Sequence, residues 1–331
     1  MPETARLIIE TATREGFTGA GIAPVSETAL QPLSDWLAKG YNAGMEYMGR
    51  NIRLRENPAG LLEGARSIMV FTMPYPDSII GKSGEKYAGF AIGKDYHYII
   101  KERLSRIAGT CLPSGSRYRV FCDSAPVMER YWAEKCGLGA IGKNNFLISK
   151  ASGARVLIGE ILTDETFDEE TVGALKDWND SNDRLHFNPG FCAGCGRCIE
   201  ACPNGALKGR GLLDASKCIS YHTVESKDRI PEYIVTKGWV LGCEECLLAC
   251  PFSRPPRTEQ AISTEQAIRN ADNDGARLCA TEFYTNAGLL ESLGKEDWER
   301  MDNAAFKSHF KGTAFERPGL EKLKDNINKA K

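Results

Sequence analysis

Residues 191–207, FCAGCGRCIEACPNGAL, contain four cysteines at the spacing C-x₂-C-x₂-C-x₃-C, followed by proline. This spacing is typical of proteins that bind [4Fe–4S] clusters, in which the fourth cysteine serves a different cluster from the first three. Thiolates suit such clusters because they are soft, anionic ligands. We therefore expect one cluster on Cys192, Cys195 and Cys198. The fourth cysteine, Cys202, should bind a second cluster.

A second group of cysteines lies in LGCEECLLACPF, at residues 241–252. By the ferredoxin pattern, Cys250 completes the first cluster, whereas Cys243 and Cys246 join Cys202 on the second. The two motifs supply seven cysteines, and two clusters need eight. One ligand of the second cluster must therefore come from elsewhere in the chain.

The eighth ligand has several candidates. Cys111, Cys122 and Cys136 precede the cysteine motifs, and Cys279 follows them. Only Cys218, in DASKCISYHTVE, lies between them, so we assign it as the eighth ligand. The other four are expected to be buried small hydrophobic residues. Structural zinc is the alternative for the whole set, because Cys₄ zinc sites also use C-x₂-C pairs, but the triple spacing disfavours it.

Two further motifs carry weaker signals. CGLGAIGKNN contains a G-x-G-x-x-G, but a dinucleotide fingerprint must follow a strand and open a helix. Here a helical pattern precedes the glycines, so we expect a tight turn whose N–H groups could approach a ligand. DYHYII begins like the lower-ligand motif of some cobalamin proteins, yet Ile100 stands where that motif has glycine. His97 is therefore not expected to bind cobalt through it.

Composition limits the classes of protein. The chain has 331 residues, a net charge of −2, 42% hydrophobic and 26% charged residues, which are ordinary values for a globular protein. The balanced charge means that any nucleic-acid surface must be local. Its twelve cysteines do not suit a secreted disulfide framework, because the chain is long and has no signal peptide. No apolar run approaches the roughly 18 residues of a membrane span. We expect a cytoplasmic protein without a membrane anchor.

Patterns along the chain predict the elements that must position these residues. Short apolar runs predict strands at 65–75 and 154–164. Helical spacing predicts helices at 95–108 and 125–136, with Pro126 in the first turn of the second.

The chain divides into three predicted parts. Residues 1–175 read as an α/β (α+β) domain that begins with an amphipathic helix, and 171–188 as a polar connector. Residues 176–258 form the ferredoxin-like module for two clusters, and 259–331 a helical C-terminal segment that covers it.

Several separated motifs, taken together, resemble the epoxyqueuosine reductase family, which comprises cobalamin-dependent iron–sulfur enzymes of queuosine-tRNA synthesis. The match covers nearly the whole chain and agrees with Cys218 as a ligand. Beside the cysteine motifs, it rests on GMEYMGRNIRLRENP (44–58), GKDYH (93–97), CDSAPVMERYWAEKCGLGAIGKNNFLI (122–148), GEILTD (159–164) and CISYHTVE (218–225).

The resemblance implies a fold, a reaction and a set of site residues. Electrons would pass through two [4Fe–4S] clusters to base-off cobalamin, which reduces the epoxide. Asp123, in the D-S-A-P-V motif, would be the proton donor, which requires burial to raise its pKa. The same residue could instead cap a helix, or do both. The cobalamin-binding residues it implies are Arg55, Tyr96, Asp123, Leu147, Ile158 and Ser220.

The implied partners are a tRNA carrying epoxyqueuosine at the wobble position and an external low-potential electron donor, with the enzyme a monomer. Candidates for tRNA contact are residues 50–55, Lys143, Arg254 and Arg257, each of which could equally be a solvated surface charge. The C-terminal tail follows the family only loosely, which bears on the substrate more than on the cofactors. Two other functions stay open: a cobalamin and iron–sulfur reductase of another small substrate, such as an organohalide, or an electron carrier without cobalamin.

Overall fold

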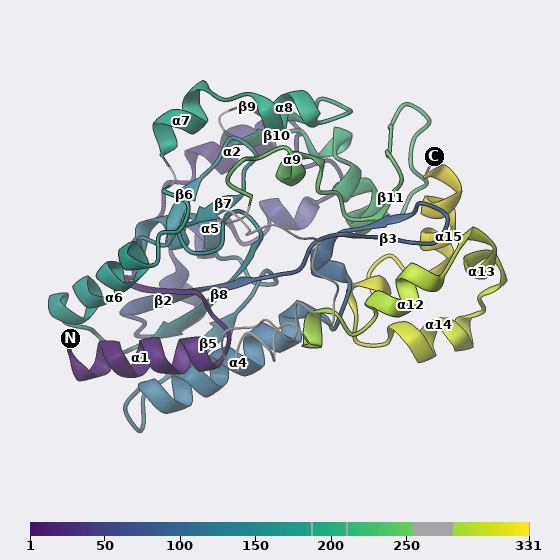
Figure 1. Cartoon of the computed structure of the whole chain (residues 1–331). Helices are drawn as coiled ribbons and strands as arrows, with labels where there is room; N and C mark the ends of the chain where they lie inside the picture. Colours follow the sequence, from purple (N-terminus) through teal and green to yellow (C-terminus); the bar gives the residue numbers. More distant parts are fainter. Residues whose placement is uncertain (187, 210, 254–280, 331) are drawn as a thin grey trace.

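The computed structural model describes residues 1–186, 188–209, 211–253 and 281–330. Its largest sheet has the strand order β1-β2-β8-β5, and every neighbouring pair is antiparallel (Figure 1). The strands are β1 (Gly19–Pro24), β2 (Ser67–Pro74), β8 (Val156–Thr163) and β5 (Tyr118–Phe121). The two central strands, β2 and β8, pair over their whole length and are apolar because helices cover both faces of the sheet.

Alternate side chains of these strands face different helices. One face packs against α1 (Glu3–Arg14), α4 (Tyr96–Cys111) and α6 (Glu169–Ser181), with Phe71 and Ile161 in its core. The other face packs against α5 (Glu129–Lys135), with Val70, Phe121 and Leu162 between sheet and helix. The α/β part is therefore three layers thick.

The predicted connector at 171–188 is wrong, because residues 169–181 form α6. Asp168 caps this helix by accepting a hydrogen bond from the Thr171 N–H. Val172, Leu175 and Trp178 recur every three residues and pack on the sheet, whereas most of the helix is polar and faces solvent. The sequence did not predict this helix because only three apolar residues mark its buried side within a polar segment.

The predicted helix at 125–136 begins only at Glu129, so Pro126 lies in the loop before it and not in its first turn. In this loop the N–H groups of Ser124 and Val127 bond to carbonyls only two residues earlier, which makes close turns instead of a helix. The predicted N-terminal helix is confirmed by α1, and that at 95–108 by α4. The strands predicted at 65–75 and 154–164 are confirmed by β2 and β8.

The cysteine-rich region consists of short elements that lie along one side of the molecule (Figure 1). They include α7 (Pro189–Gly194), α8 (Arg197–Ala201), β9 (Leu207–Gly209), β10 (Leu212–Leu213) and α9 (Glu245–Leu248). The segment after α2 (Gln31–Ala38) binds this region through its backbone, since the Ala215 N–H donates to the Tyr41 carbonyl at 2.8 Å. The N-terminal part thus holds the cysteine-rich region in place.

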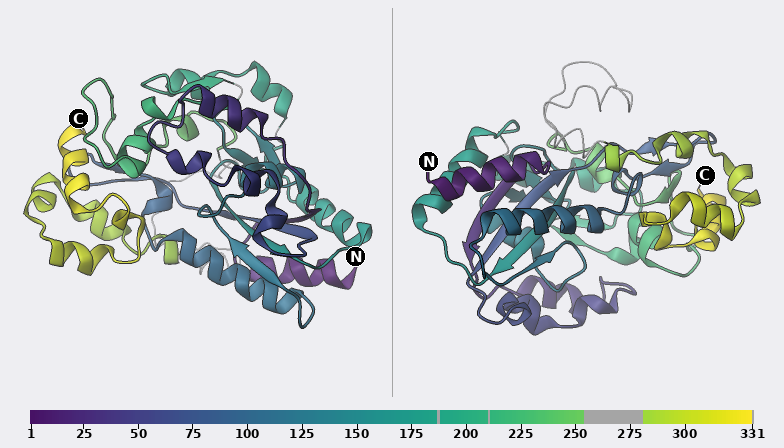
Figure 2. Two further views of the ribbon diagram at one scale, coloured as in Figure 1. Left: turned by 180° about the vertical axis from the view of Figure 1, so that it is seen from behind. Right: turned by 90° about the horizontal axis from the view of Figure 1, so that it is seen from below.

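The C-terminal helices pack on a small sheet at the end of the molecule opposite the N-terminus (Figure 2). This sheet has the order β11-β4-β3 and so joins residues from two predicted parts of the chain. Its core includes Tyr87, Val240 and a stack of Trp298 on Phe310, with ring centroids 5.4 Å apart. The elements are β3 (Ile79–Ile80), β4 (Lys86–Tyr87), β11 (Trp239–Leu241), α12 (Ala287–Ser292), α13 (Lys295–Arg300), α14 (Asn303–Phe310) and α15 (Leu320–Lys329).

The predicted fold class is confirmed in its mixed helix and sheet part and its helical C-terminal region. The packing of β3 and β4 with the C-terminal helices crosses the boundaries predicted from sequence. Across the described ranges, no helix has both the length and the apolar character needed to cross a membrane.

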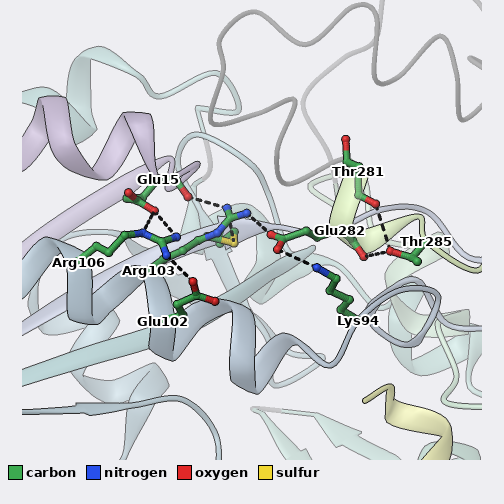
Figure 3. Close-up of polar contacts among 9 residues, drawn as sticks. Glu15, Lys94, Glu102, Arg103, Arg106, Thr281, Glu282 and Thr285 are labelled. Carbon is green, nitrogen blue, oxygen red and sulfur yellow. Dashed lines mark hydrogen bonds and ion pairs between the residues drawn. The ribbon is translucent and has the colours of Figure 1, made fainter. Parts of the chain in front are cut away.

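A buried ion pair ties α4 to the C-terminal segment (Figure 3). The Arg103 side chain is 1% exposed and pairs with Glu282, which also lies 3.4 Å from the Lys94 ammonium. Arg103 donates a further hydrogen bond to the Glu15 carbonyl at 2.7 Å. One turn along α4, Arg106 makes its own ion pairs nearer the surface.

We predict that Glu282→Gln lowers the free energy of unfolding by about 3 kcal/mol, because it leaves the Arg103 charge buried without its carboxylate. The control is Glu102→Gln, which removes a surface partner of Arg106 and should cost less than about 1 kcal/mol. Urea unfolding followed by circular dichroism measures both changes. Equal losses of unfolding free energy in the two variants would show that the burial of Arg103 does not strengthen its ion pair.

Candidate active site and cluster-binding region

Four cysteines line one cavity together with Lys143 and Asn144. They are Cys192, Cys195, Cys198 and Cys250. Phe191 and Phe252 lie against each other at its wall, with ring centroids 5.3 Å apart. The structure thus brings together the four thiols that the spacing predicted for the first cluster.

The four thiols predicted for the second cluster also lie together. Burial raises the pKa of the Cys246 thiol, and the charges of Cys218 and Cys202 raise it further. Burial likewise raises the pKa of Cys243, and the charge of Cys218 adds to it. Thiols that resist ionisation in this way need the positive charge of bound iron to become ligands. Cys218 therefore lies with the other cysteines predicted for the second cluster.

The other cysteines lie away from this region or outside the described residues. Cys111 and Cys122 are buried in the core on one face of the large sheet, and Cys136 in the core on the other face. Cys279 lies outside the described residues. Within the described ranges, no three His, Cys, Asp or Glu side chains converge on a point where a single metal ion would bind.

The G-x-G-x-x-G motif forms a β-hairpin beside the cavity. Its strands β6 (Gly139–Ile141) and β7 (Leu147–Ser149) are antiparallel, so the strand–turn–helix unit of a dinucleotide site is not formed. The backbone nitrogen of Lys143 lies 3.4 Å from the Cys192 sulfur. The Lys143 ammonium donates hydrogen bonds to the carbonyls of Ala193 and Cys195, at 2.6 and 2.8 Å. Lys143, considered above for tRNA contact, therefore holds the cysteine loop.

A fully buried ion pair fixes the second cysteine motif to the large sheet. Glu244, between Cys243 and Cys246, is 2% exposed and pairs with Arg155, which is 3% exposed and precedes β8. The other oxygen of Glu244 accepts a hydrogen bond from the Gly89 N–H at 2.9 Å. These contacts fix the second cysteine motif relative to β8 and to the segment at Gly89.

Asp123 lies on the loop between β5 and α5, with its side chain 60% exposed. Its backbone has φ +56°, in the left-handed region that Asp tolerates better than most residues. One carboxylate oxygen accepts a hydrogen bond from the Tyr96 hydroxyl at 2.6 Å and lies 3.4 Å from Nε2 of His97. Met128 is the N-cap residue of α5, so the interpretation of Asp123 as a helix cap is wrong.

His97 lies between two carboxylates. Its Nδ1 is 2.6 Å from an oxygen of Asp95, and its ring stacks on Tyr96 with centroids 4.1 Å apart. Burial alone would lower the pKa of His97, but hydrogen bonds to Asp123 and Asp95, and their charges, outweigh it and raise the pKa to about 9. The imidazole therefore carries a proton at neutral pH.

The same contacts act on Asp123 in the opposite sense. Desolvation would raise the pKa of Asp123, but hydrogen bonds from His97 and Tyr96 and the His97 charge lower it to about 2. The rise in pKa expected from sequence is therefore wrong for the protein alone, because the sequence did not show His97 as a partner. Asp123 is a carboxylate here, and the available proton is on His97.

Two more carboxyl groups, those of Glu129 and Glu160, lie close enough to Asp123 for their charges to interact. Glu129, at the start of α5, accepts a hydrogen bond from the Asp123 N–H. Burial, and then the charge of Asp123, raises the pKa of Glu129 to about 8. Glu160, in the middle of β8, is completely buried, and burial raises its pKa well above the ordinary value. Neither glutamate was identified from sequence, although a charged residue inside the apolar run VLIGEILT was a visible signal.

Arg55 was predicted to bind cobalamin and lies near this group. Its side chain is 8% exposed, and its Nε has no hydrogen-bond partner among the described residues. Burial lowers the pKa of Arg55, whereas the charges of Tyr47 and Glu129 act to raise it. A buried donor without a partner is costly unless a ligand supplies one.

The other predicted cobalamin contacts differ in their surroundings. Leu147 and Ile158 are buried in the apolar layer beneath α5, so only their backbones could reach a ligand. Strand β5 pairs only with the Glu160–Thr163 half of β8, which leaves the edge at Ile158 without a strand partner in the described part of the chain. Ser220 is half-buried and directly precedes a helical turn at residues 221–225.

A rim of polar side chains, missed by sequence reasoning, joins three distant segments beside Asp123. Glu225 accepts hydrogen bonds from the Tyr47 hydroxyl at 3.1 Å and from Arg317 at 2.5 Å. The charge of Asp123 acts on both Tyr47 and Arg317. Arg317 belongs to the divergent C-terminal tail, which therefore reaches the site.

The tRNA candidates at residues 50–55 separate into two groups. Arg50 and Arg53 are exposed, whereas Arg55 is buried. Arg254 and Arg257 lie outside the described residues.

We predict that Asp123→Asn lowers the pKa of His97 from about 9, because removing one negative partner weakens the preference for the imidazolium. NMR titration of the histidine ring signals measures this shift. Burial lowers the pKa of His222, which is an internal control that should not move. The His97–Asp123 ion pair should stabilise the folded protein fully below about pH 6.5, the ordinary pKa of histidine. This stabilisation should disappear as pH rises through about 9, where His97 loses its proton in the folded protein. An unchanged His97 titration would show that the two side chains do not interact.

Comparisons with known proteins agree with these observations. Residues 55–124 match the family model described as "Epoxyqueuosine reductase QueG, DUF1730", and residues 191–253 match a "4Fe-4S double cluster binding domain". The epoxyqueuosine reductase of Cyclobacterium marinum is 34% identical over 98% of this chain and 95% of its own. That of Synechocystis sp. is 38% identical over 86% of this chain and 93% of its own.

Solved structures show the same fold. The epoxyqueuosine reductase from Streptococcus thermophilus aligns with a TM-score of 0.77 at 23% identity, over 98% of this chain and 79% of its own. Another epoxyqueuosine reductase, solved with a tRNA-Tyr epoxyqueuosine-modified stem loop, aligns with a TM-score of 0.75 at 21% identity, over 98% and 80%. With its paired cysteine motifs and the Asp123 site, this chain belongs to the epoxyqueuosine reductase family.

Proposed function

We propose that this chain reduces epoxyqueuosine at the wobble position of tRNA to queuosine. The observation that carries the proposal is Asp123, held by Tyr96 and His97, in a chain that also gathers two groups of four cysteines. A source of single electrons and a source of protons are the two requirements of this reduction. The family relatives named epoxyqueuosine reductase, which match the chain almost end to end, support it.

Eight cysteines would hold the two [4Fe–4S] clusters. The first set is Cys192, Cys195, Cys198 and Cys250, and the second is Cys202, Cys218, Cys243 and Cys246. N–H groups of Lys143 and Ala206 lie 3.4 and 3.3 Å from the sulfurs of Cys192 and Cys202. Such bonds favour the thiolate and tune the reduction potential of a cluster.

The residues present also fit cobalamin. The unpartnered Nε of Arg55, the free strand edge at Ile158 and the Ser220 hydroxyl are polar groups available to its amide side chains. Tyr96 and Asp123 would contact it from α4 and the β5–α5 loop, and the backbone of Leu147 from β7. When bound, cobalamin would supply the electrons, received through the clusters from an external low-potential donor, that break the C–O bonds of the epoxide.

The protein's own contribution is the proton. His97 holds one at neutral pH, and Asp123 lies between it and the open side of the site. As negative charge develops on the epoxide oxygen, the Asp123 carboxylate can relay the His97 proton to it in one concerted step, because Asp123 does not hold a proton at rest. Tyr96 keeps the carboxylate in place, and the raised pKa of its own hydroxyl, due to burial and then to the charge of Asp123, makes it a hydrogen-bond donor.

The substrate would reach the site as part of a tRNA, as in the relative solved with an epoxyqueuosine-modified stem loop. The exposed Arg50 and Arg53 are placed to contact phosphates. The proposal includes a cytoplasmic location and a monomeric enzyme, in keeping with the sequence predictions.

We predict that Cys218→Ala lowers the iron content by at least the iron of one site and changes the spectrum of one cluster only. The reason is that Cys218 lies with Cys202, Cys243 and Cys246, so its loss leaves three thiols for that cluster. Iron analysis and electron paramagnetic resonance of the anaerobically purified protein measure this. Cys136→Ala is the control, and this variant should have the iron content of the wild type. Full iron content in Cys218→Ala would mean that another residue is the eighth ligand.

We predict that Asp123→Asn keeps both clusters and cobalamin but lowers turnover by about 10²- to 10⁴-fold, because the amide cannot relay a proton. The assay is conversion of an epoxyqueuosine-containing stem loop by the reconstituted enzyme with a chemical reductant, followed by mass spectrometry. Asp177→Asn, an exposed aspartate on α6, should leave the rate unchanged. Wild-type turnover by Asp123→Asn would remove Asp123 from the mechanism, and failure of the wild type to retain cobalamin would favour an electron carrier.

A further inference from the structure

Asn144 is a buried polar side chain in the wall of the first cysteine cavity. The residue is 4% exposed, and the cavity that it lines contains Cys192, Cys195, Cys198 and Cys250. Its side-chain nitrogen, Nδ2, is buried and has no hydrogen-bond partner among the described residues. A buried N–H donor without a partner destabilises the fold, so we expect a group bound in the cavity to accept a hydrogen bond from it.

The turn that carries Asn144 determines which atom of its amide is free. Asn144 lies between the hairpin strands β6 and β7, and its oxygen, Oδ1, accepts a hydrogen bond from the Phe146 N–H at 3.3 Å. A backbone N–H can only donate, so the amide atom that faces it is the oxygen and the remaining atom is the NH₂ group. Residue 142 is glycine, and a Cβ there would lie 2.7 Å from Oδ1, so the glycine leaves room for this orientation.

The same turn contacts the cysteine loop through its preceding residue. The backbone nitrogen of Lys143 lies 3.4 Å from the Cys192 sulfur. The Lys143 ammonium donates hydrogen bonds to the carbonyls of Ala193 and Cys195, which hold the loop against the turn. The turn is therefore fixed beside the ligands of the first cluster by contacts that do not use the amide of Asn144.

The geometry of the turn alone does not require an amide at this position. Aspartate also accepts a hydrogen bond from the N–H two residues later, so it would form the same turn with Phe146. Asparagine differs from aspartate in that it is neutral and donates hydrogen bonds. A [4Fe–4S] cluster on four thiolates is rich in negative charge, and hydrogen bonds to its sulfurs help to set its reduction potential. An amide donor therefore suits the wall of a cluster site better than a carboxylate does.

We propose that the NH₂ group of Asn144 donates a hydrogen bond to a sulfur of the first [4Fe–4S] cluster and so raises the reduction potential of that cluster. Reduction adds one electron, which comes from the external donor, and breaks no bond. The added negative charge strengthens the hydrogen bond, so the bond favours the reduced cluster. Asn144 is a positioning residue that acts on electron transfer through the cluster. This inference rests on the proposed function, since the cluster is part of it.

Redox titration of the reconstituted full-length protein, followed by electron paramagnetic resonance, tests the effect on the potential. Asn144→Asp keeps the acceptor for the Phe146 N–H and removes the donor. It should make the first cluster about tenfold harder to reduce, which is a shift of about 59 mV to more negative potential for a one-electron couple. Asn144→Ala removes the donor without adding charge and should shift the potential in the same direction. In Asn144→Ala the second cluster, identified by the signal that Cys218→Ala changes, should keep its potential.

Asn145→Asp is the matched control, because it adds the same charge one residue further along the turn. Among the described residues, those that line the cavity do not include Asn145. Its backbone has φ +65°, in the left-handed region that Asp and Asn both tolerate. This variant should change the potential of the first cluster much less than Asn144→Asp does. Equal shifts in the two aspartate variants, or an unchanged potential in Asn144→Ala, would overturn the proposal.

A measurement on the wild type covers the case in which a variant loses the cluster. In protein made with asparagine labelled with ¹⁵N at Nδ2, pulsed electron paramagnetic resonance of the reduced first cluster should detect a weak coupling to ¹⁵N. Asn144 is the expected source, because it is the sole asparagine among the described residues that line the cavity. An intact first cluster without this coupling would overturn the proposal and leave the proposed function standing. A wild type that forms no [4Fe–4S] cluster would overturn both.

Discussion

The structure gathers eight cysteines into two sets, and much of the rest of the chain holds them in place. The cysteines come from the paired motifs and from the isolated Cys218, and the rest of the chain holds these segments against the large sheet. The buried Arg155–Glu244 pair anchors the second motif, and Lys143 ties the first one to the β6–β7 hairpin. The charged side chains in these contacts are half-buried or buried. Separation of the sheet from the cysteine region would therefore break each contact and leave its charged group without a partner.

The site around Asp123 is organised by opposed charges. His97 is protonated because it lies between Asp95 and Asp123, and Asp123 is ionised because it faces His97 and Tyr96. The same negative charge, added to burial, keeps Glu129 and Glu160 protonated. The charge of Asp123 therefore favours the protonated form of three neighbours, although burial has the larger effect on the two glutamates. This arrangement suits a reaction that consumes protons as fast as it receives electrons.

Spacing in the sequence predicted which cysteines of the two motifs lie together, because local chain geometry fixes their positions within each motif. Strands 65–75 and 154–164 were also predictable, since both are apolar runs. Helix α6 was not, because its apolar residues recur within a polar segment, and α5 begins late because the left-handed backbone at Asp123 opens a loop. The roles of His97, Glu129 and Arg317 depend on contacts between distant segments, which neither composition nor periodicity contains.

The central claim is that this chain reduces epoxyqueuosine in tRNA. The most direct test is mass spectrometry of nucleosides in tRNA from cells that lack the gene, with and without a plasmid copy. The account predicts that epoxyqueuosine accumulates without the gene and that the copy restores queuosine. Normal queuosine in cells that lack the gene would contradict it, and the cofactor sites would then have to serve another substrate.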